Sequence, residues 1–247
     1  MEKISIVTPC YNRNKWLPLM IFNLQNQEYP RHLLEWCIID SKDGDSNERL
    51  FKSTEEIKKA EFEIGMPIKY VYYNHKISIG EKRNKLTKLA SHKICANMDT
   101  DDFYFTTWLS YSMEVMKSDP RCSLVGTKSM LFVFPDEDFK LTGIECPDKR
   151  MIHESGMLYT KKHSRSMGGF QKSSQGEGTS MIDFNENKCL TTDVNKVMIC
   201  IAHEGNTISK DRFRKHEMNQ NVDGMIKELI SDILKIRKQP QFKNNLD

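Results

Sequence analysis

KICANMDTDDFY, residues 93–104, is the stretch that decides the fold. An apolar run ends at Met98, and three carboxylates follow within four positions, at Asp99, Asp101 and Asp102. Carboxylates packed this closely repel one another and raise one another's pKa values unless a positive charge lies among them. A bound cation would supply that charge, and so would the N-terminus of a helix. The stretch alone leaves both interpretations open.

On both sides of this stretch, short apolar runs typical of β-strands alternate with segments of helix length. The strand-like runs are residues 4–9, 34–40, 68–74, 93–99 and 123–134, and the helical segments between the first four are 15–27, 46–65 and 79–92. Such an alternation indicates βαβ units and a largely parallel sheet that helices cover on both faces. We therefore predict an α/β fold with a nucleotide-binding type of sheet.

The second half of the chain has shorter strand-like runs and one clear helical pattern. Residues 103–120 place apolar side chains on one face, which predicts a helix that begins near Phe103, with Asp102 as its N-cap. Further predictions are strands within 139–144, 155–162 and 195–203, an irregular, lid-like loop over 161–180, and an amphipathic helix over 222–238.

Charge and composition exclude several classes of protein. The 37 basic and 34 acidic residues leave a formal charge of +3, so no strong basic field marks a nucleic-acid-binding protein. No apolar run is long enough to span a bilayer, and the chain enters a strand-like run at once, without a signal peptide. The seven cysteines lie mostly in apolar runs and lack zinc-site spacing, which favours buried thiols in a reducing compartment. We predict a soluble, cytoplasmic protein.

Polar side chains follow three of the predicted strands, in TPCYNR (8–13), DSKDGDS (40–46) and DTDD (99–102). Ligands of open α/β sheets bind outside the carboxyl ends of the parallel strands, so these stretches are expected to line one crevice. Thr8, Pro9 and Tyr11 could offer a hydroxyl, a fixed shape and an aromatic face to a nucleotide base.

Asp40 and Asp43 allow two interpretations. Asp40 could accept a hydrogen bond from a base N–H group, and Asp43 could accept one from a ribose hydroxyl. Alternatively, Asp43 begins an ordinary turn and helix cap, because Asp, Gly and Ser all form such turns well.

Asp99 and Asp101 are two positions apart in an extended segment, so their side chains point to the same side. Carboxylates placed this way can share one Mg²⁺ or Mn²⁺ ion, directly or through water, and leave coordination positions for substrate phosphates. The competing interpretation, in which a carboxylate caps a helix, fits Asp102 best. We therefore assign Asp101 to the metal and Asp102 to the cap.

These segments occur in the order of a known family. TPCYN after the first strand, Asp40 with DGDS after the second, GEKRN before the fourth and MDTDD after it together resemble a family 2 glycosyltransferase of the GT-A type. The resemblance runs from residue 3 to about residue 205. It implies an α/β, Rossmann-like, mixed and mainly parallel sheet flanked by helices, with a smaller antiparallel part on the acceptor side. It also implies one domain over 1–247, with a nucleotide-binding half (1–102), an acceptor-side half (103–205) and a C-terminal helical segment (206–247).

The resemblance assigns donor-binding residues. Pro9, Tyr11 and Asp40 would hold the nucleotide base, and Asp43 would assist them. The remaining donor-binding candidates are Gly80, Arg83, Asn84, Asp99, Thr100 and Asp101, which would reach the nucleotide, its ribose, its diphosphate and the metal. A helix start at Gly80 with Arg83 beside it has an independent rationale, since both favour a phosphate nearby.

The resemblance also assigns the metal and catalytic residues. Mn²⁺ or Mg²⁺ would be bound by Asp99 and Asp101, and His203 resembles an additional metal ligand. Glu177, which follows a Gly169-Phe170 turn, would be the catalytic base. The family usually has two acidic residues where this chain has Glu177-Gly178, so Asp183 is a rival for that role.

By this resemblance the protein would be a metal-dependent, inverting hexosyl- or deoxyhexosyltransferase. Its donor would be a nucleotide-diphosphate sugar, with UDP preferred, and its acceptor a hydroxyl of a glycan or glycoprotein. One alternative is a module of the same fold that binds nucleotide sugars without turnover. Another is a haloacid-dehalogenase-like phosphatase with Asp99-Thr100-Asp101 as its nucleophile motif. The Lys- and Asn-rich composition fits a stand-alone cytosolic or virus-encoded enzyme.

Overall fold

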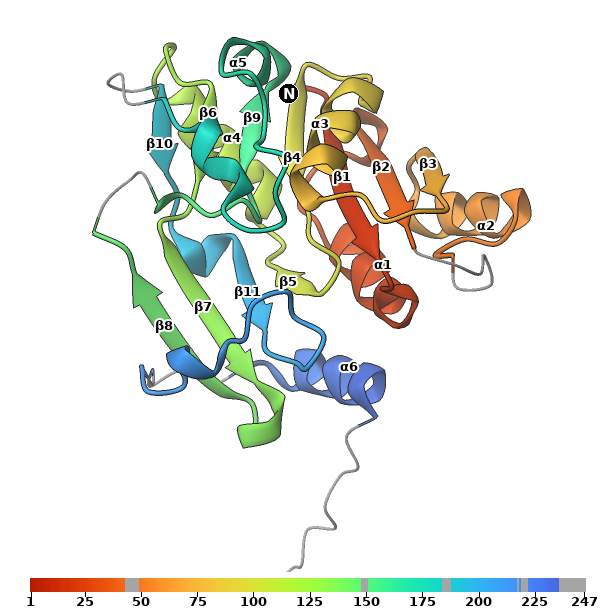
Figure 1. Cartoon of the computed structure of the whole chain (residues 1–247), viewed down its shortest axis with the longest axis vertical. Helices are drawn as coiled ribbons and strands as arrows, with labels where there is room; N and C mark the ends of the chain where they lie inside the picture. Colours follow the sequence, from red (N-terminus) through yellow and green to blue (C-terminus); the bar gives the residue numbers. More distant parts are fainter. Residues whose placement is uncertain (43–48, 148–150, 184–187, 217, 219–221, 236–247) are drawn as a thin grey trace, which may run out of the picture.

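The computed structural model describes residues 1–42, 49–147, 151–183, 188–216, 218 and 222–235, which form two β-sheets with helices packed around them (Figure 1). The seven-stranded sheet has the order β10 (Cys189–Thr191), β6 (Leu124–Gly126), β9 (Leu158–Thr160), β4 (Ile94–Asn97), β1 (Ile4–Tyr11), β2 (Leu34–Ser41) and β3 (Ile68–Tyr73). The four-stranded sheet has the order β5 (Asp102–Tyr104), β11 (Met198–Ile201), β7 (Ser129–Phe134) and β8 (Lys140–Glu145).

The larger sheet is mainly parallel, as predicted. β1 pairs in parallel with β2 and β4, and β2 pairs in parallel with β3. β9 runs antiparallel between β4 and β6. Every residue of β2 is buried, which is expected for a central parallel strand with both faces covered.

Six α-helices are described: α1 (Leu17–Gln25), α2 (Thr54–Ile64), α3 (Ile79–Leu89), α4 (Trp108–Lys117), α5 (Lys161–Ser166) and α6 (Gly224–Leu234). Local signals set the bounds of α2 and α3. The side chain of Ser53 accepts the N–H of Glu56 to begin α2, and Gly65 ends α2 in the left-handed conformation at φ 69°. Ser78 accepts the N–H of Glu81 to begin α3.

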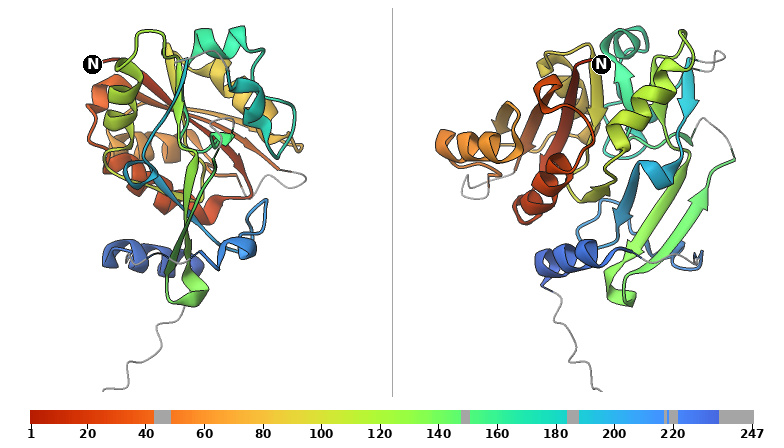
Figure 2. Two further views of the ribbon diagram at one scale, coloured as in Figure 1. Left: turned by 90° about the vertical axis from the view of Figure 1, so that its left-hand side faces the viewer. Right: turned by 180° about the vertical axis from the view of Figure 1, so that it is seen from behind.

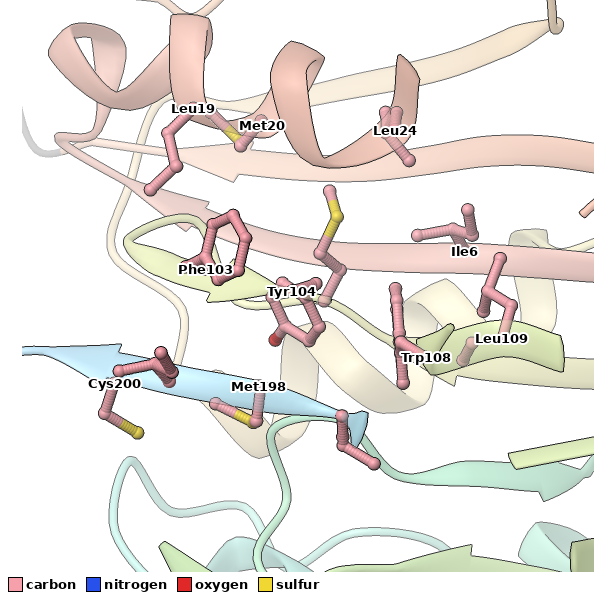
Figure 3. Close-up of a cluster of buried hydrophobic side chains, with 14 of the residues drawn as sticks. Ile6, Leu19, Met20, Leu24, Phe103, Tyr104, Trp108, Leu109, Met198 and Cys200 are labelled. Atoms are coloured by element: carbon pink, nitrogen blue, oxygen red, sulfur yellow. The ribbon is translucent and has the colours of Figure 1, made fainter. Parts of the chain in front are cut away.

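Two hydrophobic clusters fill the two faces of the larger sheet. Ile4 and Ile6 of β1 belong to one cluster, which includes residues of α1, α4 and the smaller sheet (Figure 3). Val7 belongs to the other cluster, together with Leu86 of α3 and Phe170. Because neighbouring strand residues point to opposite faces, this division follows from the sequence of β1. The predicted single domain over 1–247 stays a prediction, although the first cluster joins both sheets.

The smaller sheet is the expected mostly antiparallel part. β11 pairs antiparallel with β5 and in parallel with β7, and β7 pairs antiparallel with β8. Figure 2 shows this sheet extending away from one end of the larger sheet, with α6 beside it. Met198 and Cys200 of β11 pack in the same cluster as Phe103 of β5 (Figure 3).

The predicted cap role of Asp102 is wrong. Residues 102–104 form β5, and α4 begins only at Trp108, after Thr107. Asp102 is paired with Cys200 of β11. The apolar side chains of Phe103 and Tyr104, which resemble the start of a helical pattern, belong to the strand instead.

Two further predictions need correction. The expected strand over 123–134 divides into β6 and β7, because the side chain of Thr127 bonds to the backbone of Ser129 and the chain passes from one sheet to the other. The expected loop over 161–180 is not structureless, since it contains α5 and the start of a 3-10 helix (Glu177–Met181). The C-terminal helix is present, but α6 ends at Leu234.

Candidate functional site

A cavity of about 730 Å³ lies at the carboxyl ends of β1 and β4. Cavities of a few hundred Å³ at this edge of an α/β sheet are the usual place for a ligand. The lining includes residues within 9–13, 76–83, 99–102, 153–155, 174–177 and 205–213. Two of the three polar stretches predicted to meet in a crevice therefore do meet.

Asp99 and Glu177 share one buried arginine. The guanidinium of Arg83 donates from Nη2 to Asp99 Oδ1 at 2.8 Å and from Nε to Glu177 Oε1 at 3.0 Å. The side chain of Arg83 is 2% exposed. Burial alone would lower the pKa of Arg83, but the charges of Asp99, Glu177 and Glu154 outweigh burial and raise it. Arg83 is therefore a fixed cation among three carboxyl groups.

Asp101 has its own set of partners. His203 Nε2 lies 2.9 Å and Arg13 Nε lies 3.3 Å from Asp101 Oδ2. The Gly205 N–H donates to His203 Nδ1 at 3.0 Å, so Nε2 carries the imidazole hydrogen and donates it to Asp101. Burial would raise the pKa of Asp101, but the hydrogen bond from His203 and the charge of Arg13 lower it below its usual value.

Arg13 reaches Asp101 because the chain turns sharply after β1. Asn12 adopts a left-handed φ of 54°, a conformation that asparagine tolerates better than most residues. Arg13 then also donates from Nη2 to the carbonyl of Gly205 at 2.6 Å. The centroids of the Trp16 and His203 rings are 4.6 Å apart, so Trp16 packs against the imidazole.

Asp102 is the third carboxyl group, and its surroundings shift its pKa in the opposite direction to that of Asp101. Burial, then the charges of Asp101 and Asp99, raise the pKa of Asp102 to about 8. Its Oδ2 accepts the hydroxyl of Ser155 at 2.9 Å, and Ser155 is in turn 2.7 Å from the hydroxyl of Tyr104. The three crowded carboxyls thus differ in how their repulsion is reduced. Asp99 and Asp101 have cationic or hydrogen-bonding partners, and the raised pKa of Asp102 favours its neutral form.

Asp99, Asp101 and His203 are side chains of the chemical types that bind Mn²⁺ or Mg²⁺. Carboxylate oxygens suit both ions, and the imidazole of His203 suits manganese-like ions. Within the described part of the chain, no group of three or more His, Cys, Asp or Glu side chains is placed to hold an ion. Substrate phosphates would therefore have to supply further ligands, and His203 would have to give up its Nε2 hydrogen to coordinate.

Three of the predicted donor-binding residues, Pro9, Tyr11 and Thr100, line the cavity. The ammonium groups of Lys76 and Lys82 lie 5.4 and 5.2 Å from the centre of the Tyr11 ring. Lys82 also donates to the carbonyl of Cys10, and burial lowers the pKa of Lys82 to about 8. Lysines beside an aromatic ring make this part of the cavity suitable for a base and a phosphate.

Thr8 and Asp40 lie away from the cavity lining. The hydroxyl of Thr8 accepts the indole N–H of Trp36 at 2.8 Å and is fully buried. Asp40 Oδ2 accepts the N–H of Leu50 at 2.9 Å and the hydroxyl of Tyr70 at 2.7 Å. Nucleotide contacts by these two side chains stay predictions and would require these bonds to be exchanged. Asp43 lies outside the described residues.

Gly80 and Asn84 support a neighbouring loop. A Cβ atom at Gly80 would lie 1.7 Å from the carbonyl oxygen of Gln171, so only glycine lets the loop approach. Asn84 donates to the carbonyl of Phe170 at 2.7 Å and accepts its N–H at 2.8 Å. These residues position the segment that leads to Glu177.

The two candidate bases lie in different surroundings. Glu177 lines the cavity and is buried at its wall. Asp183 is not among the lining residues, and its carboxylate pairs with Lys188 at 2.8 Å. Glu154, which no sequence motif indicated, does line the cavity beside Glu177. Arg13 and Glu154 reach the site through tertiary contacts, so only their nearness to predicted strand ends could have drawn attention to them.

Of the basic residues after β11, Lys210 and Arg212 line the cavity, whereas Arg214 pairs with acidic residues. Arg214 lies 2.8 Å from Asp136 and 2.6 Å from Glu137. Within the described residues, no helix has both the length and the apolar character needed to cross a membrane.

Comparison with known proteins identifies the family. The profile of the family described as Glycosyl transferase family 2 matches residues 5–167. Among curated protein sequences, none matches the chain significantly.

Several solved structures are similar in fold. The crystal structure of S. aureus TarS 1-349 has a TM-score of 0.60 and 15% identity, over 81% of this chain and 60% of that one. Its complex with UDP-GlcNAc has a TM-score of 0.61 and 16% identity, over 94% and 71%. The mannosyltransferase PcManGT from Pyrobaculum calidifontis, in complex with GDP-Man and Mn²⁺, has a TM-score of 0.57 and 16% identity, over 96% and 66%. The chain thus spans only 60% of TarS 1-349, and the likeness at these identities concerns the fold.

Proposed function

Because this chain belongs to glycosyl transferase family 2, we propose that it moves a sugar from a nucleoside-diphosphate donor to a hydroxyl of a glycan or glycoprotein. The complexes of TarS with UDP and UDP-GlcNAc and of a mannosyltransferase with GDP-Man support a nucleotide-sugar donor. A UDP-sugar is the preferred donor. Cytoplasmic location and a viral source remain predictions from the sequence.

One observation carries this proposal: Asp99, Asp101 and Arg83 meet Tyr11 in a single cavity at the carboxyl ends of β1 and β4. These residues come from three separate segments that the family resemblance had already linked to the donor. Their meeting at one place is what a donor site requires, since the base, ribose and diphosphate must all be held together.

Basic side chains would bind the diphosphate. The cationic residues of the cavity lining are Arg13, Lys76, Lys82, Arg83, Lys210 and Arg212. Positive groups at a leaving diphosphate stabilise the charge that develops there in the transition state. Asp99, Asp101 and His203 would hold Mn²⁺ or Mg²⁺, which, when bound, would stabilise the same charge.

The acidic wall of the cavity, formed by Glu154 and Glu177, would take the proton of the acceptor hydroxyl. In an inverting transfer the acceptor oxygen attacks the anomeric carbon from the side opposite to the diphosphate, and a carboxylate takes its proton. Glu177 and Glu154 both belong to this wall, whereas Asp183 lies outside the lining. The ion pair of Glu177 with Arg83 keeps open the alternative of a module that binds nucleotide sugars without turnover. Family membership leaves no support for the phosphatase alternative.

A donor screen tests the proposal. The purified chain is incubated separately with UDP-GlcNAc, UDP-glucose, UDP-galactose and GDP-mannose, each with Mn²⁺, with Mg²⁺ or with EDTA, and release of the nucleoside diphosphate is measured with and without glycan acceptors. We expect one donor to be consumed in the presence of metal. Donor binding without any release, measured by calorimetry, would favour the binding module. Absence of both binding and release for all four donors would contradict the proposal.

A further inference from the structure

Glu154 lies in the loop before β9 and has a carboxyl group with one open oxygen. Its Oε1 accepts the N–H of Gly178 at 2.9 Å. Its Oε2 has no hydrogen-bond partner in the described parts of the chain. This oxygen is not one of the buried side-chain atoms that lack a partner, so it is accessible to solvent. Because Glu154 lines the cavity, this oxygen is available to a ligand.

The carboxyl group of Glu154 occupies the place where a side chain of residue 178 would project. A Cβ atom added to Gly178 would lie 2.5 Å from Cγ and 3.0 Å from Cδ of Glu154. The glycine therefore makes room for a carboxylate that arrives from a different segment. The result is a pair of neighbouring acidic residues, Glu154 and Glu177, at one wall of the cavity.

Glu177 is poorly placed to take a proton. Its side chain is 6% exposed, and its Oε1 lies 3.0 Å from Nε of Arg83. Protonation of Glu177 would weaken this buried ion pair. Arg83 also pairs with Asp99, so it already faces two anions, and no hydrogen bond joins it to Glu154 among the described residues.

We propose that Glu154, and not Glu177, accepts the proton of the acceptor hydroxyl in the transfer reaction, an inference that rests on the function proposed above. The acceptor oxygen forms a bond to the anomeric carbon, the bond from that carbon to the diphosphate breaks, and the nucleoside diphosphate leaves with the electron pair. The proton of the hydroxyl passes to Oε2 of Glu154. Glu177 keeps Arg83 in position.

The surroundings of Glu154 suit this role. Burial, then the charge of Glu177, raise the pKa of Glu154 above its usual value. A carboxylate whose pKa lies closer to neutral accepts a proton more readily, which is how enzymes adjust a glutamate for general base catalysis. The hydrogen bond from the Gly178 N–H holds Oε1 of Glu154 in place and leaves Oε2 for the acceptor hydroxyl.

Glu154→Gln and Glu177→Gln form a matched pair for the first test. The glutamine at 154 can still accept the N–H of Gly178, so the loop is retained. We expect this variant to reduce kcat about 100-fold or more, the effect typical of removing a general base, with donor affinity unchanged. Its remaining activity should lose the acidic limb of the wild-type pH profile. Glu177→Gln should mainly raise the donor KM, because its partner Arg83 also holds Asp99.

Relocation of the carboxylate is the second test. Gly178→Asp alone places a Cβ atom against Glu154 and should lower the melting temperature. In the double variant Glu154→Ala with Gly178→Asp the space is vacant, and the new carboxylate lies beside the old position. We expect the double variant to be at least about tenfold more active than Glu154→Ala.

The outcomes distinguish a wrong role for Glu154 from a wrong proposed function. Wild-type-like kcat in Glu154→Gln, together with a large loss of kcat in Glu177→Gln, would overturn the role of Glu154. If both variants lose kcat, recovery in the double variant supports it and absence of recovery overturns it. A wild-type protein that neither binds nor consumes any donor would instead refute the proposed function itself.

Discussion

Glu35 and Glu154 are glutamates near opposite ends of the strands of the larger sheet, and their pKa values move in opposite directions. Glu35, near the start of β2, accepts the Ser5 hydroxyl and the Ser91 N–H, both at 2.5 Å, and lies 3.2 Å from Lys69 Nζ. Glu154, at the cavity, accepts the N–H of Gly178 at 2.9 Å. Burial raises the pKa of Glu154, whereas the partners of Glu35 outweigh burial and lower its pKa to about 2.

The difference shows that buried polar groups have different surroundings at the two ends of the strands. At the amino ends of the strands, a buried carboxylate has enough donors to remain an anion, so it stabilises the fold. At the carboxyl ends, Asp99 and Glu177 share the single cation of Arg83, and Arg83 still keeps a buried Nη1 without a hydrogen bond among the described residues. Unsatisfied groups cost stability, and they are tolerated where a ligand can use them.

The largest expected effect is a loss of turnover that distinguishes Asp101 from its neighbour Asp102. Asp101→Asn removes an anion that partners Arg13 and His203, and we expect turnover with metal to fall about 1000-fold. Asp102→Asn is the matched control, because the raised pKa of Asp102 favours its protonated form and an amide resembles that form. Its turnover should stay within about threefold of the wild type. Steady-state release of the nucleoside diphosphate measures both, and equal losses would contradict the division of roles.

The next effect concerns stability at the cavity. Arg83→Gln leaves Glu177 and Asp99 without their shared cation, and breaking a buried ion pair in this way costs about 3 kcal/mol. For a chain of this size the melting temperature should fall by about 6–12 °C. Lys85→Gln on the same helix is the control, since the pair of Lys85 with Glu81 is exposed and 3.8 Å long. A control that melts as low as Arg83→Gln would show a general effect on α3.

Glu35, at the amino ends of the strands, provides a test of how stability depends on pH. The pKa of Glu35 is lowered from 4.5 to about 2, so its anion stabilises the fold above pH 4.5 and loses this effect as the pH falls towards 2. Glu35→Gln should therefore reduce the free energy of unfolding at pH 7 by about 2–3 kcal/mol and flatten its change between those pH values. Glu154→Gln should leave that free energy unchanged or raise it, because a carboxyl with a raised pKa lowers stability at neutral pH. Urea titrations across pH 3–7 measure both.

The sequence predicted the parallel half of this fold well because its signals are local. The apolar runs at 4–9, 34–40, 68–74 and 93–99 each correspond to a strand, with bounds that differ by a few residues. Strand ends then follow from topology, and with them the positions of Tyr11, Asp99 and Asp101 at one cavity.

The second half was harder to predict because its structure depends on distant contacts. Asp102 resembled a helix cap, yet β5 forms through pairing with β11, almost a hundred residues later. The raised pKa of Asp102 depends on burial and on the charges of Asp101 and Asp99 together. Glu154 lies beside Gly178 only after folding, so no spacing in the sequence could indicate it.

The smallest expected effect tests how the cavity edge is supported. Asn84→Ala removes two hydrogen bonds to the backbone of Phe170, which lies in the loop that leads to Glu177. Neutral hydrogen bonds of this kind contribute about 1 kcal/mol each, so the melting temperature should fall by about 4–8 °C. If the loop is held by α3 and not by a bound donor, saturating donor should restore little of this loss. Full recovery with donor, seen in a thermal shift assay, would mean instead that Asn84 acts through the ligand, as the sequence had suggested.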